Sequence, residues 1–145
     1  MATYSSSLVS GSAPVPSHGL YGNTKVISAT VSCTAAPSTS DTLQFFTLPK
    51  NAKVHMAVLA ASDMDTNGTP TLALNVGDAG SASRLFAAST VGQAGTLSSA
   101  IATTGFEYQY TADTLITGTA SNNAATGAAG TVTLTVFYTL EGGAS

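Results

Sequence analysis

The sequence predicts an all-β protein: an antiparallel β-sandwich of about eight strands in a jelly-roll-like arrangement. Three observations carry this prediction. Short segments alternate between apolar and polar side chains and are rich in β-branched residues, which is typical of half-buried strands. Loops rich in Gly, Pro, Asn and Asp separate these segments. No long stretch shows the 3.6-residue period of an amphipathic helix.

The first three strands are the easiest to place. Residues 25–34 alternate apolar and hydroxyl side chains, and residues 42–48 lead into a turn that contains a proline. Residues 53–61 form the third expected strand, and their alternation predicts one buried face. That face consists of Val54, Met56, Val58 and Ala60.

The second half of the domain alternates in the same way, with weaker boundaries. Residues 84–91 fit either a short strand or one or two helical turns. Residues 131–140 show the clearest alternation in the chain, with every second position apolar. The other expected strands, in chain order, are residues 71–76, 96–103, 106–110 and 114–120.

Composition divides the chain into an arm at residues 1–24, a β-sandwich domain at 25–140 and a short tail at 141–145. The arm is rich in Ser, Gly and Pro, and Pro14 and Pro16 favour an extended backbone. We expect it to become ordered against a partner and to leave the domain folded when it is removed. The expected partner contacts are Tyr4, Leu8, Val9, Val15, Leu20 and Tyr21.

Charge is scarce, and this excludes several classes of partner. Among 145 residues there are four Lys or Arg and seven Asp or Glu, while 79 are Ala, Thr, Ser or Gly. Four dispersed cations cannot neutralise many phosphates, so we expect no nucleic-acid binding. No apolar run reaches the length of a membrane span. The one cysteine, Cys33, cannot form a disulfide within the chain and is compatible with synthesis in a reducing cytosol.

One loop resembles half of a calcium site. Asp63, Asp65 and Asn67, followed by Gly68, match the first half of an EF-hand loop, whose oxygens bind Ca²⁺. The twelfth position, which should be a bidentate Glu, is Leu74. The alternative is a polar turn whose side chains bind local amides, and this is the more common role of such residues.

Nothing in the sequence predicts an enzyme or a cofactor. His18 and His55 are the only groups suited to acid–base work near neutral pH, and neither lies near a carboxylate or a second histidine in the sequence. Cys33 fits a buried apolar position. Phe106, Tyr108 and Tyr110 alternate on one expected strand, which fits core aromatics or a stacking platform for sugar rings.

Several motifs together resemble small structural proteins of tailed bacteriophages. The stretch 45–54 (FFTLPKNAKV) is similar to a pattern F-x-L-P-x-x-A-x-V in those proteins. The stretches 71–78 (TLALNVGD) and 84–90 (RLFAAST) follow, and then Ala94-Gly95. The resemblance covers residues 26–138 and is greatest to capsid decoration, or cement, proteins.

The resemblance implies a virion protein that binds the outer surface of a capsid and stabilises it by bridging neighbouring subunits. The implied partners are the major capsid protein and further copies of the chain, most simply as a homotrimer. Two alternatives remain at this stage. One is another phage component, in the tail, the neck or a head fibre, and the other is a carbohydrate-binding or adhesion module.

Overall fold

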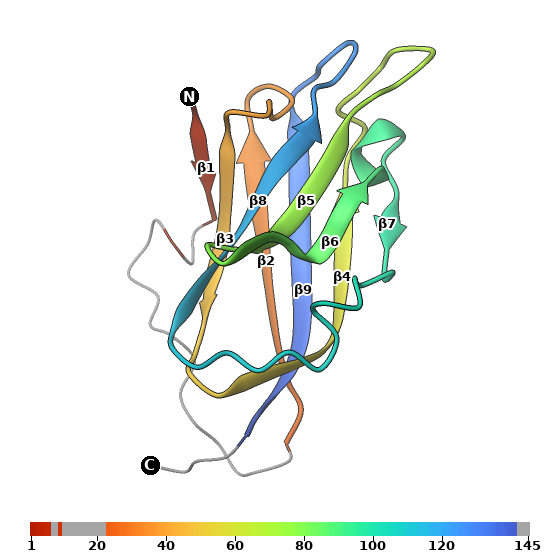
Figure 1. Cartoon of the computed structure of the whole chain (residues 1–145). Helices are drawn as coiled ribbons and strands as arrows, with labels where there is room; N and C mark the ends of the chain where they lie inside the picture. The colour runs from red at the N-terminus through yellow and green to blue at the C-terminus, as the bar shows by residue number, and fades with distance from the viewer. Residues whose placement is uncertain (7–8, 10–22, 142–145) are drawn as a thin grey trace.

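The computed structural model describes residues 1–6, 9 and 23–141, and these form two β-sheets packed face to face (Figure 1). The five-stranded sheet has the order β1-β3-β8-β5-β6, and the four-stranded sheet has the order β2-β9-β4-β7. The strands are β1 (Thr3–Ser5), β2 (Lys25–Cys33), β3 (Thr42–Leu48), β4 (Ala52–Ala61), β5 (Ala73–Asp78), β6 (Ser81–Ser89), β7 (Leu97–Ser98), β8 (Thr114–Asn122) and β9 (Gly130–Leu140).

The strand order confirms the jelly-roll prediction. From β2 onward the chain crosses between the sheets at every connection except β5 to β6, and it leaves four strands in each sheet. All neighbouring strands among these eight are antiparallel. Two four-stranded antiparallel sheets with this connectivity form the double Greek key of a jelly roll. β1 is an addition to this plan, and it pairs in parallel with β3.

The predictions for the segment between β5 and β8 were partly wrong. The ambiguous residues 84–91 lie mostly in β6, which a short 3₁₀ helix at Val91–Gln93 follows. Only two residues of the weak strand expected at 96–103 pair, as β7. The strand expected at residues 106–110 does not form, because Glu107 has a left-handed backbone (φ 62°) that interrupts the alternation.

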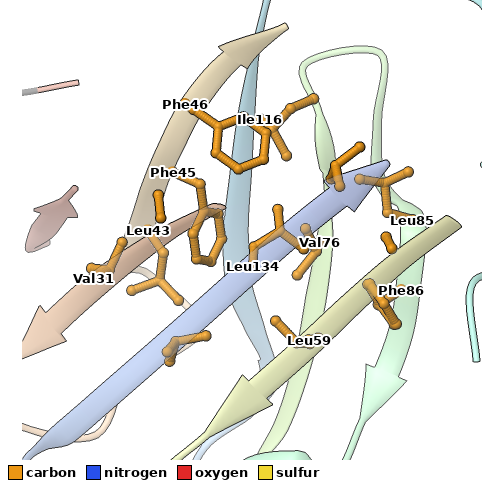
Figure 2. Close-up of a cluster of buried hydrophobic side chains, with 14 of the residues drawn as sticks. Val31, Leu43, Phe45, Phe46, Leu59, Val76, Leu85, Phe86, Ile116 and Leu134 are labelled. Atoms are coloured by element: carbon orange, nitrogen blue, oxygen red, sulfur yellow. The ribbon is translucent and has the colours of Figure 1, made fainter. Parts of the chain in front are cut away.

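The core lies between the two sheets, where large side chains from both interdigitate (Figure 2). Phe45 and Phe46 are both buried although they are adjacent, because a bulge in β3 between Gln44 and Phe46 changes the alternation there. The four-stranded sheet contributes Leu134 and Val136 of β9 and Leu59 of β4 to the same core. The apolar residues of this sequence are few, yet they suffice for a core, whose largest fully buried side chains are Tyr138, Phe45 and Phe46.

A second bulge overturns the predicted face of β4. Val54 pairs with Tyr138 and Met56 pairs with Phe137, so His55 is an extra residue without a partner in the β9 ladder. An extra residue exchanges the two faces of the strand that follows it. Val54 is therefore buried as predicted, whereas Met56 is 42% exposed. The buried residues after the bulge are instead Ala57 and Leu59.

The start of the arm belongs to the domain, which corrects the expectation that it becomes ordered only on a partner. Thr3, Tyr4 and Ser5 pair with β3, and the Tyr4 side chain packs against the core. The Ala2 amide donates to Asp41 Oδ1 at 2.8 Å, and the buried Ser6 hydroxyl donates to the carbonyl of Phe45. None of the described residues forms a helix that could cross a lipid bilayer.

Candidate functional site

The outer surface of the four-stranded sheet carries a group of apolar side chains, which we call the apolar face. Its members are Val26, Met56, Val58, Ala60, Leu97 and Phe137. Val26 and Met56 flank Phe137 in one row across three strands. Val26 is 56% exposed and Leu97 is 68% exposed. A contiguous group of exposed apolar side chains on a folded domain usually marks an interaction site.

The β4 residues of the apolar face point outward because of the bulge at His55. Without the extra residue, Met56, Val58 and Ala60 would point into the sandwich, as the sequence alternation predicts. The outer surface of the five-stranded sheet is different, since most of its outward positions in the central strands are polar. Gln44, Asn75, Thr117 and Thr119 lie there, with Leu115 as a half-buried apolar exception. The two sides of the sandwich are therefore chemically distinct, and the large exposed apolar side chains Val26, Met56 and Leu97 lie on the four-stranded side.

Neighbouring rows of the four-stranded sheet carry hydroxyls that satisfy one another. The Ser28 and Thr135 hydroxyls are 2.8 Å apart, and those of Thr30 and Thr133 are 2.7 Å apart. Each pair uses one hydrogen bond within the protein in place of one with water. This lowers the cost of covering the surface with a partner, since fewer polar groups lose their hydration.

A charged network borders the apolar face at the bulge. Glu107 accepts from Lys53 Nζ at 2.8 Å and contacts His55 Nδ1 at 2.9 Å. The other ring nitrogen of His55 lies 2.7 Å from the Thr139 hydroxyl, which donates to Glu141 at 3.1 Å. The hydrogen bond from Lys53 holds the pKa of Glu107 below its ordinary value. The sequence separates His55 and Glu107 by 52 residues, so this contact was not predicted.

The candidate calcium loop uses its carboxylates internally. Asp65 is buried and accepts four backbone amides, from Thr71, Leu72, Ala125 and Thr126, at 2.7–3.0 Å. Burial alone would raise the pKa of Asp65, but these amides outweigh it and hold the pKa far below its usual range. Asp63 accepts the Asp65 amide, and Asn67 accepts that of Thr69. In the described ranges, no three His, Cys, Asp or Glu side chains are grouped closely enough to bind a metal.

A second buried carboxylate organises the opposite end of the sandwich. Asp78 accepts from Arg84 Nε at 2.5 Å and from the Tyr110 hydroxyl at 3.1 Å. The guanidinium lies 3.8 Å from the centre of the Tyr108 ring, a cation–π contact. Tyr110 is thus buried, while Phe106 is 55% exposed. The aromatic residues 106, 108 and 110 do not share a face, so the stacking platform considered from the sequence does not form.

The remaining candidate residues divide between described and undescribed parts of the chain. Cys33 is buried, and burial, with a smaller effect of Asp41, raises its pKa to about 11, so its thiol is unreactive. Of the expected partner contacts, Tyr4 packs on its own core, and Val9 is half-buried with its amide donating to Ser6. Outside the described residues lie Leu8, Val15, His18, Leu20 and Tyr21.

Comparison with known proteins identifies the family. No family model matches the sequence, and no curated protein matches it. A chain in the solved structure "Cyanophage Pam1 capsid asymmetric unit" is 48% identical over 88% of this chain and 92% of its own length, with a TM-score of 0.76. This chain belongs to a family of phage capsid structural proteins.

A second solved structure supports the same assignment. A chain in "Capsid of Ralstonia phage GP4" is 30% identical, covers 97% of this chain and 99% of its own length, and has a TM-score of 0.85. The resemblance to phage virion proteins is thereby confirmed. The two structures support a capsid-associated structural protein of the virion. An apolar, weakly charged outer face is compatible with such a protein.

Proposed function

We propose that this protein is a capsid decoration protein: it binds the outer surface of the phage shell and stabilises the shell by bridging neighbouring subunits of the major capsid protein. The observation that carries the proposal is the apolar face, in a chain that belongs to a capsid family. An exposed apolar surface of this kind is stabilised when a subunit of the shell covers it. The protein acts by binding, without catalysis or a cofactor.

The proposal includes the arrangement of copies. The protein is made in the cytoplasm of the bacterial host and attaches to the shell as a homo-oligomer, most simply a trimer. Each copy then contributes one apolar face. When several faces of one oligomer bind at once, avidity makes the attachment stable even if each contact is weak. The remainder of the arm, beyond Ser6, adds reach to neighbouring subunits.

The test is reconstitution on capsids that lack the protein. Purified protein is mixed with such capsids, and the bound fraction is measured by co-sedimentation. Met56→Glu places a charge on the apolar face and should weaken binding by about tenfold or more, since burying an unpaired charge is costly. The matched control is Thr117→Glu, which adds the same charge to the outer surface of the five-stranded sheet and should leave binding unchanged.

The outcomes separate the possible places in the virion. Density for the protein on the outside of the reconstituted shell supports decoration. Failure of the unmodified protein to bind capsids, together with density for it in a tail, neck or head fibre of intact particles, would refute it. Equal loss of binding for both variants would assign the contact to a surface other than the apolar face.

A further inference from the structure

One large aromatic side chain among the described residues is exposed, and it lies outside the sheets. It belongs to Phe106, which is 55% exposed. Val26, Met56 and Leu97, the other large apolar side chains exposed beyond the chain start, are all members of the apolar face. Aromatic side chains are enriched at interfaces between proteins, and an exposed ring forgoes the free energy of burial. Phe106 is therefore a candidate contact residue.

Phe106 occupies a corner of a tight turn. The turn spans residues 105–108, and the Tyr108 amide donates to the Gly105 carbonyl at 3.2 Å. Phe106 and Glu107 are its two central residues. The Phe106 amide also donates to the carbonyl of Ala102, at 3.1 Å, so the residue is held by its own backbone. The exposure of the ring is thus a property of an ordered turn.

The turn is fixed on β6. The Ala102 amide donates to the carbonyl of Leu85 at 2.7 Å, and the Thr104 hydroxyl donates to that of Arg84 at 3.0 Å. Gly105 lies so close to β6 that a side-chain carbon there would be 2.5 Å from the Arg84 carbonyl oxygen. A binding residue on a rigid turn loses little conformational freedom when a partner covers it, which favours affinity.

The other central residue of the turn has an unfavourable backbone conformation. Glu107 has a φ of 62°, in the left-handed region that a turn usually assigns to glycine. Its amide donates to the Val54 carbonyl at 2.8 Å, and its carboxylate contacts Lys53 and His55, which lie on the outer side of β4. A left-handed glutamate costs free energy, and such positions cluster where function needs one particular geometry.

These contacts place Phe106 beside the apolar face. Residues 107–110 run antiparallel to the start of β4, since Gln109 forms a bridge with Lys53 and Glu107 donates to Val54. The preceding residue, Phe106, therefore lies alongside the bulge of β4, next to Met56. The row of Val26, Phe137 and Met56 ends at this edge of β4. Phe106 is thus the apolar residue nearest in register to the end of that row.

We propose that Phe106 is an anchor residue of the capsid contact: its ring enters an apolar pocket of the shell subunit that covers the apolar face. This inference rests on the proposed function and extends the contact to a residue outside the sheet. A few large side chains that fill pockets of the partner carry most of the binding free energy of an interface. The partner needs an apolar pocket wide enough for one aromatic ring.

Truncation of the ring tests the anchor. Phe106→Ala should weaken binding to capsids that lack the protein by about tenfold, measured by co-sedimentation. Phe106→Leu keeps much of the apolar area and should weaken binding by about threefold or less. The matched control is Thr103→Ala, since Thr103 is exposed on the same loop, and it should bind like the unmodified protein. Thermal melts of all three variants check that the fold is retained.

A tryptophan at the same position reports directly on burial. The sequence contains no tryptophan, so Phe106→Trp introduces the only one, and capsids with unmodified protein supply the background. Fluorescence emission should move to shorter wavelength when the capsid is bound, because the ring leaves water. An unshifted emission in the bound complex would overturn the inference.

The outcomes distinguish this inference from the proposed function. Unchanged binding of Phe106→Ala, while Met56→Glu still weakens binding, would overturn the anchor and leave the decoration role standing. Failure of the unmodified protein to bind capsids would refute both. Sedimentation velocity without capsids covers the remaining occupant, a second copy of the chain. Weaker self-association of Phe106→Ala would assign the ring to a contact between copies and overturn the inference.

Discussion

Asp78 shows how a sequence so poor in charge uses the few charges that it has. Arg84, Tyr110 and the amides of Gly80 and Ser81 all donate to its carboxylate. Burial alone would raise the pKa of Asp78, but the hydrogen bonds from Arg84 and the amides outweigh burial and hold the pKa below its ordinary value of 3.8. The cluster ties the loop that contains Tyr108 and Tyr110 to the end of the five-stranded sheet.

Replacing Asp78 by Asn should therefore destabilise the fold at neutral pH by about 3 kcal/mol, because the partly buried Arg84, whose side chain is 15% exposed, is left without its counter-ion. The folded-state pKa is lowered, so the carboxylate stabilises the fold above the unfolded pKa and this contribution is lost as the pH falls below about 4. Urea unfolding at pH 7 and at pH 3 should show the difference between the two proteins narrowing in acid. A pH-independent difference would contradict this reason.

A matched replacement separates the buried pair from a general effect of removing a carboxylate. Asp113 is exposed and accepts one amide hydrogen bond, from Lys50. Asp113→Asn should change the free energy of unfolding by less than about 1 kcal/mol.

Asp65 leads to a prediction about calcium. Both of its oxygens already accept backbone amides in a buried site, so a cation would have to displace hydrogen bonds that hold two loops together. We expect the same melting temperature in millimolar Ca²⁺ and in chelator, and a lower one for Asp65→Asn in both. A ligand that binds the folded state raises the melting temperature. A higher melting temperature with Ca²⁺ than with chelator would therefore contradict this prediction and indicate that the loop binds calcium.

At the scale of elements, β1 makes the start of the arm part of the domain. Tyr4→Ala removes a half-buried ring from the edge of the core, which should lower the free energy of unfolding by about 1–2 kcal/mol. Removing residues 1–6 should cost more, since the hydrogen bonds to β3 are lost too. Thermal melts of both variants measure the loss of stability as a lower melting temperature. Melting temperatures equal to that of the full chain would show that β1 does not contribute to stability.

The elements that sequence reasoning placed well are those whose alternation continues unbroken. β2 alternates over its full length and β9 alternates as far as Tyr138, and over these residues the burial agrees with the pattern. The prediction failed where a local backbone event changes the alternation: the bulge at His55 in β4 and the left-handed Glu107. A bulge has no residue signature in KVHMAVLAA, because Met, Val and Ala are acceptable on either face of a strand.

The candidate site depended on such an event, so it could not have been found in the sequence. Reading β4 without its bulge buries Met56 and Val58 and turns Ala57 and Leu59 outward, so it places the wrong side chains on the outer surface. β1 was missed for a different reason. Three residues carry too little periodicity to predict a strand, and β1 is held by contacts to Asp41 and β3 that are distant in the sequence.

At the scale of the whole molecule, charge and apolar surface occupy different places. Among the described residues, the ion pairs lie at the bulge and in the Asp78 cluster. The apolar face itself carries no charged side chain. With a net charge of −3 over 145 residues, the molecule has little long-range field with which to steer or to repel a partner.

Binding to capsids should for this reason depend only weakly on salt. Contacts between charged surfaces are screened and weaken as the ionic strength rises, whereas burial of apolar surface does not. We expect the dissociation constant for capsids to change by less than about threefold between low salt and 0.5 M NaCl. In sulfate at the same ionic strength it should fall, since sulfate strengthens apolar burial. Co-sedimentation titrations measure both, and a large loss of affinity in NaCl would show that charged contacts, such as those of the Lys53–Glu107 network, carry the binding instead.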